Sequence, residues 1–491
     1  MLEKLAKQSA IYGVSTIIGR LLSYLLTPYY TRIFAQGEFG VITDVYALIP
    51  FALVVLTLGM ESSYFRFAAK AEAQGGGTEA IKRAKERLFT TTWGVTTFAS
   101  LLFVGAVMLL EQPLARAMGE LYVAQPLILT LVAGIVAFDV IASVPFARLR
   151  EQGRAKCYVA IKLLNIVLQV GLAFAAGAAG LFDSEFGVGW VLVANLVASA
   201  VTFVAILFAI GRIRLSFDGA LLRNIVVYSM PLLLSGVAAT ATDFIDRQMI
   251  KYLVPDGAME QLGVYGAVIK IAVVMTLFTQ MYRLAAEPFF LSNFKKEDFV
   301  AMNAAVMKYF VMASMVIFLG IVLFKDLFAL IVGPDFREGI YILPIVLGAN
   351  ILMGVWLNLS FWYKREERTS LALVVTIAGL IAAVIFNLVF IPRWGYYGAA
   401  WARFIGNAVM VAVSYVLNYK LYPTPYPVAR IAEHVAVAMA VYGISLLAGR
   451  CGMVMWQSYA LGAVLLSLYL IYIVRREKIN VGAMVKSMLR R

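Results

Sequence analysis

The chain has 491 residues, of which 62% are hydrophobic and only 14% are charged. Soluble domains carry about a quarter charged residues and roughly half apolar ones, so this composition excludes an ordinary soluble domain. The formal net charge of +14 would suggest a nucleic-acid partner in a soluble protein, but the placement of the basic residues argues against one.

The apolar residues gather in runs of roughly 18 to 25 residues, and one such run crosses a hydrocarbon core of ~30 Å. Because lipid offers the backbone no hydrogen-bond partner, runs this long and continuous predict helices and not barrel strands. We therefore expect an all-α integral membrane protein with about fourteen transmembrane helices. In chain order, the predicted spans are 9–34, 40–65, 89–110, 125–147, 157–181, 188–211, 224–249, 262–290, 304–325, 339–363, 369–391, 396–419, 429–449 and 454–474.

The first span follows Lys4 and Lys7 and has no small-residue cleavage site, so we expect a retained helix and not a signal peptide. Most Lys and Arg residues lie in the N-terminal segment, the even-numbered loops and the C-terminal tail. The positive-inside rule then places both termini in the cytoplasm. The same residues attract anionic membrane lipids, and no nucleic-acid partner is expected.

A weak internal repeat divides the chain. Glu-Phe-Gly-Val at 38–41, before span 2, matches Gln-Leu-Gly-Val at 261–264, before span 8, and an Arg-Glu pair follows both span 4 and span 10. The common order of these matches predicts two six-helix lobes related by an axis along the membrane normal. The alternative is chance similarity among apolar helices. The predicted domains are an N-lobe at 1–222, a C-lobe at 223–425, and an addition at 426–491 with spans 13 and 14 and the cytoplasmic tail.

Several short segments resemble a known family. They are Gly19-Arg20, Pro-Tyr-Tyr-Thr-Arg-Ile-Phe at 28–34, Glu-Phe-Gly at 38–40, Leu-Arg-Glu-Gln-Gly-Arg at 149–154 and the Gly-Tyr-Tyr-Gly-Ala-Ala-Trp-Ala segment at 395–402. Together with the order of spans along essentially the whole chain, they resemble polysaccharide-biosynthesis membrane proteins. These are the O-antigen, or Wzx-like, flippases of lipid-linked oligosaccharides, in the superfamily that also holds multidrug extruders and lipid II flippases.

The resemblance implies a V-shaped pair of six-helix lobes that encloses a central cavity and works by alternating access. The implied substrate is a polyprenyl-pyrophosphate-linked sugar repeat unit. It would move from the cytoplasmic to the periplasmic leaflet of the bacterial cytoplasmic (inner) membrane, for the assembly of O-antigen, capsule or exopolysaccharide.

Arg20 is the first candidate for substrate binding. It lies roughly 17 Å along the first span, near the membrane midplane, and shares a helical face with Thr16, Ser23 and Thr27. A charge at this depth must face a cavity or a partner. We predict a cavity-facing cation for pyrophosphate, which a guanidinium can bind through two hydrogen bonds. The alternative is a buried pair with a carboxylate. The resembling lipid II flippases also place an essential arginine in the first span, which fits Arg20.

Three further cations are candidates for substrate binding. Lys270 lies roughly 12 Å into span 8 and is the predicted C-lobe counterpart of Arg20, unless it snorkels to the surface. Arg283, on the same helix, lies four residues before Glu287, with which it could simply pair. Arg403, in span 12, is the third candidate.

Two acids are candidates for ion coupling. Asp139 lies roughly 21 Å into span 4, so it is either the partner of a cation or a group that binds H⁺ or Na⁺. Asp243, near the outer end of span 7, is either an ion site or part of an interfacial cluster. On span 5, Lys162, Asn165 and Gln169 form a polar stripe, with Lys162 close enough to the cytoplasm to snorkel.

No Ser/His/Asp set, nucleotide motif or phosphate-binding glycine loop is visible, so we expect no enzyme, no cofactor and no metal. His434, the one histidine, is predicted to be an interfacial residue. Cys157 and Cys451 are expected at opposite membrane faces, too far apart for a disulfide.

The sequence therefore predicts a secondary flippase in which Arg20, with Lys270 or Arg403, neutralises the pyrophosphate while the polyprenyl tail stays in lipid. Its expected partners are the lipid-linked glycan, membrane lipids, H⁺ or Na⁺, and a polysaccharide polymerase. A lipid II flippase or a multidrug exporter of the same superfamily is the alternative. A membrane glycosyltransferase or polymerase is disfavoured, because the outer loops are short.

Overall fold

The computed structural model describes residue 24 and residues 26–478, apart from 76, 215, 294–297, 367, 369 and 451–452. Over these residues the chain forms α-helices and two short 3-10 segments, and no strand occurs among them. The predicted all-α membrane fold is thus confirmed.

Within this part of the chain, eleven helices are long and apolar enough to cross a membrane, or twelve if a bent pair counts as one span. The predicted number of fourteen is not confirmed. Most of the first predicted span, 9–34, lies outside the described residues. One long helical run, Ser370–Leu421, covers the described part of the predicted span 369–391 and all of 396–419.

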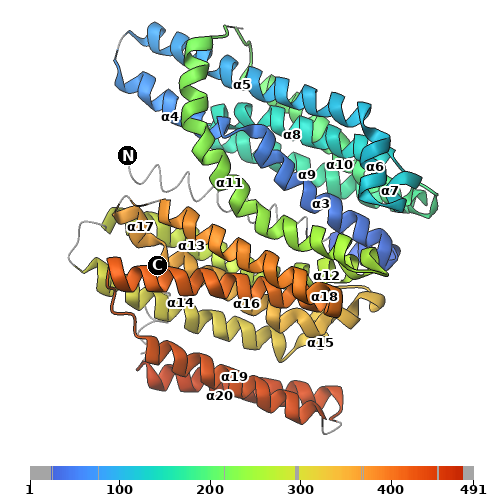
Figure 1. Cartoon of the computed structure of the whole chain (residues 1–491), viewed down its shortest axis with the longest axis vertical. Coiled ribbons are helices and arrows are strands. Elements are labelled where there is room, and N and C mark those ends of the chain that lie inside the picture. Colours follow the sequence, from blue (N-terminus) through green and yellow to red (C-terminus); the bar gives the residue numbers. More distant parts are fainter. Residues whose placement is uncertain are drawn as a thin grey trace. The chain divides into compact units, whose positions relative to one another are not determined.

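The chain divides between Gln248 and Met249 into two compact units (Figure 1). The lobe boundaries expected from the repeat stay a prediction. The helices of the first unit are α2 (Leu26–Ile33), α3 (Gln36–Thr57), α4 (Met60–Ala73), α5 (Thr78–Leu109), α6 (Glu111–Met118), α7 (Glu120–Ala124), α8 (Leu127–Glu151), α9 (Ala155–Ala178), the 3-10 helix η1 (Leu181–Asp183), α10 (Gly187–Ile210) and most of α11 (Gly219–Leu253).

Helix α8 forms the centre of the first unit. It packs against α3, α4, α5, α9 and α10. Apart from Asp139 and its charged last turn, its sequence is apolar on nearly every side, which is typical of a helix with many neighbours. Ile135, Val136, Val140 and Val144 are accordingly fully buried.

The joint between α3 and α4 depends on a glycine. Leu58 and Gly59 both adopt left-handed backbone angles, with φ of 50° and 68°. A Cβ atom on Gly59 would also lie 3.1 Å from the carbonyl oxygen of Ser229. Glycine at this position therefore permits both the bend and the close approach of α11.

The second unit contains the remaining helices. They are α12 (Ala258–Ile271), α13 (Val273–Asn293), α14 (Phe299–Val322), α15 (Lys325–Ala329), the 3-10 helix η2 (Pro334–Ile342), α16 (Leu343–Leu359), α17 (Phe361–Arg365), α18 (Ser370–Leu421), α19 (Val428–Arg450) and α20 (Met455–Arg476). Helices α12 and α13 form the bent pair, with an angle of 48° between them. Helices α19 and α20 pack on each other and on α14.

Helix α18 is a hairpin of two predicted spans. Its 52 residues would extend ~78 Å if straight, far beyond one membrane thickness. The helix is interrupted at Gly395, where φ is 55°. A Cβ atom on Gly406 would lie 3.0 Å from the carbonyl oxygen of Gly379. The two halves therefore run back along each other in close contact.

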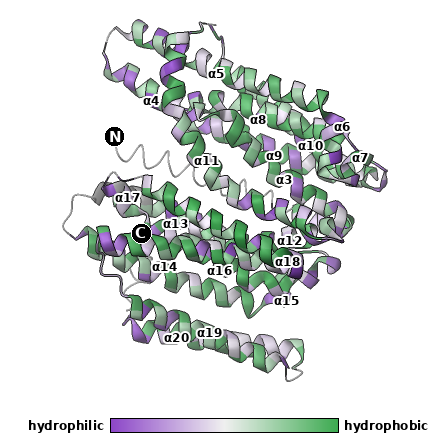
Figure 2. Ribbon diagram, viewed as in Figure 1, coloured by the Kyte–Doolittle hydropathy of each residue, from purple (hydrophilic) through white to green (hydrophobic). Residues whose placement is uncertain are grey.

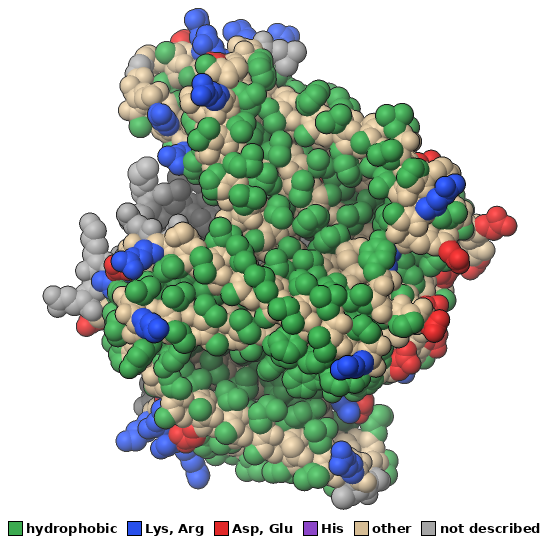
Figure 3. Space-filling model, in the orientation of Figure 1, with side chains coloured by type: hydrophobic (Ala, Val, Ile, Leu, Met, Phe, Trp, Pro, Cys, Tyr) green, Lys and Arg blue, Asp and Glu red, His purple; other side chains and the backbone are tan. Residues whose placement is uncertain are grey.

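The surface of each unit is that of a membrane protein. Apolar side chains cover the flanks of the helices, and charged side chains gather near the helix ends (Figures 2 and 3). Large apolar residues are exposed on these flanks, including Phe98, Leu109 and Phe208. Soluble monomers rarely expose contiguous apolar patches of this kind. Together with the eleven long apolar helices, this surface identifies a multi-pass membrane protein.

Candidate functional site

A network of polar side chains lies among the helices of the first unit. Tyr46 of α3 is its meeting point. The Tyr46 hydroxyl accepts a hydrogen bond from the side-chain amide of Gln169 on α9 (3.0 Å) and another from that of Asn195 on α10 (3.3 Å). Asn195 is buried, and Tyr46 and Gln169 are half-buried. The network therefore ties three spans together at one point.

The network continues along α9 and α10. Asn165, one turn from Gln169, donates to the Thr202 hydroxyl at 2.9 Å. Asn195, Ser199 and Thr202 follow each other at steps of four and three residues, so they share one face of α10. All three are buried. The sequence predicted the stripe on α9, and the structure places the polar face of α10 opposite it.

Asp139 of α8 joins this network and meets a cation there. Its carboxylate accepts a hydrogen bond from Ser199 and interacts electrostatically with Lys162 of α9. The Lys162 ammonium also lies 4.2 Å from the centre of the Phe146 ring, within the range of a cation–π interaction. Asp139 is predicted to be either the partner of a cation or an ion-binding group, and the first of these roles requires a cation such as Lys162 nearby.

Lys162 has the features of an anion-binding group. It lies about two turns into α9, roughly 10 Å from the first residue of that helix. Its side chain is nevertheless exposed, whereas Asp139 is half-buried. An ammonium group has three donors and no acceptor. It can therefore bind Asp139 and still offer charge-assisted hydrogen bonds to a phosphate.

The structure places the other predicted cations as follows. Arg20 lies outside the described residues, so its role stays a prediction. Lys270 is half-buried in the last turn of α12, directly before the bend into α13. Arg283 is exposed on α13, and Arg403 is half-buried in the second half of α18. The roles of these three residues in substrate binding also stay predictions.

Asp243, the second predicted acid, is exposed on α11. The guanidinium of Arg247 donates to its backbone carbonyl oxygen at 3.1 Å. Asp246, one turn further along, is fully buried. The role of Asp243 in ion coupling stays a prediction.

Sequence reasoning missed a buried carboxylate, Asp44 of α3, which is fully shielded from solvent. The hydroxyl of Tyr122 donates to one of its oxygens at 2.7 Å, and the side-chain amide of Gln248 donates to the other at 2.5 Å. These two hydrogen bonds tie α3 to α7 and to α11. The sequence feature that could have indicated this residue is the position of an acidic side chain inside the predicted span 40–65.

In the second unit, His434 of α19 is fully buried. Its Nε2 lies 3.1 Å from a carboxylate oxygen of Glu477, just after α20, and the other oxygen accepts a hydrogen bond from Lys308 of α14. Glu477 thus links α14, α19 and the end of α20, and His434, predicted to be interfacial, is buried in this link. Over the described residues, no group of three His, Cys, Asp or Glu side chains is placed to hold a metal ion.

The fold is similar to that of solved membrane transporters. The lipid II flippase MurJ, in an inward closed conformation, matches with a TM-score of 0.76 over 96% of this chain and all of its own, at 11% identity. A multidrug resistance MATE family transporter of the MOP superfamily, in an inward-facing conformation, matches with a TM-score of 0.68 at 16% identity. That match covers 82% of this chain and 93% of the transporter. At such low identity, these similarities establish the fold.

Two sequence comparisons relate the chain to other proteins, and one of them identifies its family. "Lsg locus putative protein 1" of Haemophilus influenzae is 21% identical over 439 residues, which are 86% of this chain and 100% of that protein. A family model described as "Polysaccharide biosynthesis protein" matches residues 5–294. This match covers more than half of the sequence. The chain therefore belongs to the polysaccharide biosynthesis protein family.

Proposed function

We propose that the protein is a secondary flippase that moves polyprenyl-pyrophosphate-linked oligosaccharide units across the bacterial cytoplasmic membrane. The observation that carries this proposal is the polar network around Asp139 and Lys162, inside an apolar helical unit of a chain from this family. A charged pair at this depth is costly unless it serves a pathway or a binding site. A sugar–pyrophosphate headgroup is a cargo that needs both a cation and many neutral hydrogen-bond partners.

In this proposal Lys162 joins Arg20 as a cation for the pyrophosphate. Asn165, Gln169, Asn195 and other amide and hydroxyl groups of the network offer hydrogen bonds to the sugars. The polyprenyl tail stays in lipid. Lys270, Arg283 and Arg403 serve the same substrate from the second unit.

The pair also suggests how transport is coupled to an ion. Asp139 competes with a phosphate for the same ammonium group of Lys162. Protonation of Asp139 would remove that competitor and favour phosphate binding, and release of the phosphate would restore the pair. Coupling to H⁺ or Na⁺ through Asp139, or through Asp243, is part of the proposal.

The proposed orientation places both termini in the cytoplasm, as the distribution of basic residues indicates. We also propose the division into an N-lobe at 1–222, a C-lobe at 223–425 and a terminal pair at 426–491. A polysaccharide polymerase is the proposed consumer of the exported unit, and no catalytic step is assigned to this chain.

The proposal is tested in a strain in which the gene is deleted and replaced by variants. Lys162→Gln and Arg20→Ala should abolish surface glycan and accumulate lipid-linked oligosaccharide in the cytoplasmic leaflet. Lys156→Gln is the matched control, because Lys156 is an exposed cation two turns earlier on α9. Normal surface glycan in a Lys162→Gln strain with a normal level of the protein would contradict the role of Lys162.

A lipid II flippase is the second candidate, and the fold similarity to MurJ favours it. The same deletion strain separates the two. Accumulation of lipid II, with normal levels of other lipid-linked glycans, would replace the first proposal by the second. Export of a cationic drug that is lost in the deletion strain would instead favour a multidrug exporter.

A further inference from the structure

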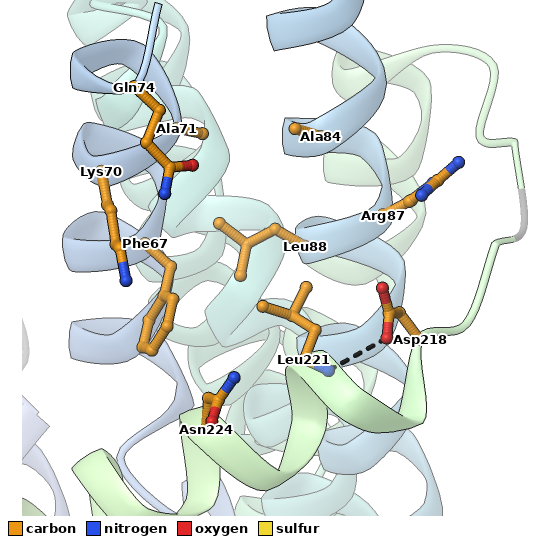
Figure 4. A pocket seen from close by; sticks show the side chains of 10 residues that line it. All are labelled: Phe67, Lys70, Ala71, Gln74, Ala84, Arg87, Leu88, Asp218, Leu221 and Asn224. Carbon is orange, nitrogen blue, oxygen red and sulfur yellow. Dashed lines mark hydrogen bonds between the residues drawn. The ribbon is translucent and has the colours of Figure 1, made fainter.

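A pocket of about 270 Å³ lies in the first unit where α4 ends and where α5 and α11 begin (Figure 4). It is separate from the network around Asp139 and Lys162 and shares no residue with it. The residues that line it are Phe67, Lys70, Ala71, Gln74, Ala84, Arg87, Leu88, Asp218, Leu221 and Asn224.

The pocket has an apolar floor and a cationic rim. Phe67, Leu88 and Leu221 come from three different helices and turn toward one another in Figure 4. Lys70 extends from α4 on the side of Phe67, and Arg87 extends from α5 above Asp218, with its guanidinium directed away from the apolar residues in Figure 4. Both cations are exposed. The lining thus suits a molecule that is anionic at one end and apolar at the other.

Neither cation of the rim has a carboxylate partner within the described part of the chain. Other basic residues nearby are engaged. Lys85 binds Glu72 and Glu151, and the guanidinium of Arg66 lies 4.0 Å from the centre of the Tyr228 ring. Lys70 and Arg87 are therefore the positive charges that this pocket offers to a ligand.

Asp218, an acidic residue of the lining, offsets one of the two cations and leaves the lining with a net positive charge. Its carboxylate accepts a hydrogen bond from the backbone N–H of Leu221 at 2.9 Å and so caps the start of α11. A carboxylate in this position is committed to the first turn of the helix and to its dipole.

Hydrogen bonds hold the walls of the pocket in place. The Thr90 hydroxyl of α5 donates to the carbonyl oxygen of Ser216 at 2.7 Å, and Thr91 accepts from the backbone N–H of Asp218 at 3.1 Å. Lys85 links α5 to Glu72 of α4. A pocket built in this way requires little ordering when a ligand binds.

We propose that this pocket binds the phosphate-bearing headgroup of an anionic membrane phospholipid. It lies at the ends of long apolar helices, where headgroups meet protein. Basic pockets between transmembrane helices are suited to such headgroups, and Arg and Lys form charge-assisted hydrogen bonds to phosphate. The volume is near the lower limit of small-molecule sites, roughly 300 Å³, so it fits a headgroup while the acyl chains remain in the bilayer.

The test uses the full-length protein in a neutral detergent, with phosphatidylglycerol added in mixed micelles and bound lipid counted by native mass spectrometry. The Lys70→Gln/Arg87→Gln double variant should bind the lipid about 25-fold more weakly, roughly five-fold for each cation. The charge-retaining variant Lys70→Arg/Arg87→Lys should bind it within a few-fold of the wild-type value. Lys82→Gln/Arg83→Gln is the matched control, because these two cations are exposed on α5 and do not line the pocket.

Three outcomes would overturn the proposal. Equal weakening by the control pair would mean that anionic lipid is attracted to the surface in general. Equal binding of phosphatidylcholine would remove the role of the anionic headgroup. Competition by glycerol 1-phosphate at the same concentration as phosphatidylglycerol would mean that the site takes a free phosphate ester and not a lipid.

Discussion

The carboxylate of Asp139 on α8 and the ammonium of Lys162 on α9 interact with each other across two neighbouring helices of the first unit. The two partners differ in exposure, because Lys162 is exposed and Asp139 is half-buried. Water can therefore solvate Lys162 more easily than Asp139 if either loses its partner. Because of this difference in exposure, removal of Lys162 and removal of Asp139 should change the free energy of unfolding by different amounts.

Loss of the lysine should cost more stability than loss of the acid. Lys162→Gln leaves a half-buried carboxylate without its cation, and we expect a loss of about 1–2 kcal/mol, below the value for fully buried pairs because one partner is exposed. Asp139→Asn leaves an ammonium that water can reach, and should cost less. Thermal unfolding of the purified variants in detergent measures both.

The double variant Asp139→Asn/Lys162→Gln completes a double-mutant cycle with these two single variants. It should be more stable than the sum of the two single losses implies, because the stranded charge is gone. Lys156→Gln should leave the unfolding temperature unchanged. A larger loss of stability for Asp139→Asn than for Lys162→Gln would contradict the assignment of Asp139 as the half-buried partner and Lys162 as the exposed one.

The hydroxyl of Tyr46 should be required for the stability of the first unit. Tyr46→Phe removes the acceptor for Gln169 and Asn195 and leaves two amide groups without that partner. We expect a loss of about 1–3 kcal/mol in the free energy of unfolding. Tyr419→Phe is the control, since Tyr419 is 73% exposed. A Tyr46→Phe protein with the wild-type unfolding temperature would show that the amides find other partners.

Much of this fold follows from sequence patterns, because long apolar runs report directly on spans. The Trp-Gly-Tyr-Tyr-Gly segment around Gly395 divides the run that ends at Leu421, and the structure has the hairpin there. Helical periodicity likewise places Lys162, Asn165 and Gln169 on one face. A periodic pattern describes one helix at a time, and so it cannot say which helix lies opposite.

The contacts of the candidate site depend on which helices lie opposite each other, and the sequence pattern does not give this. Asp44 meets Tyr122, 78 positions away, and Gln248, 204 positions away. Asp139 and Lys162 each stand out as charges within predicted spans, but nothing in either helix indicates that they face each other. The tertiary packing of α3, α8, α9 and α10 decides these pairs.

Gly59 should tolerate no side chain. Gly59→Ala places a Cβ atom 3.1 Å from the carbonyl oxygen of Ser229, at a φ of 68°. The left-handed conformation alone costs a non-glycine residue roughly 1–2 kcal/mol, and the contact adds to this. Gly94→Ala is the matched control, because no atom lies within 4 Å of its Cβ position inside α5. That variant should be neutral or more stable by roughly 0.5–1 kcal/mol. Equal unfolding temperatures for the two variants would contradict the tight joint between α3 and α4.

The link between α14, α19 and α20 should weaken in acid. Burial opposes ionisation of Glu477, but the hydrogen bonds and charges of Lys308 and His434 outweigh it and hold the pKa of Glu477 below its ordinary value of 4.5. A carboxyl group whose pKa is lower in the folded state adds stability above pH 4.5, and that stability is lost as the pH falls through the folded-state pKa. The wild-type unfolding temperature should therefore fall in this range more steeply than that of Glu477→Gln. Glu79→Gln, at an exposed position of α5, should keep the wild-type slope. Parallel curves for wild type and Glu477→Gln would show that this carboxylate does not hold the terminal helices.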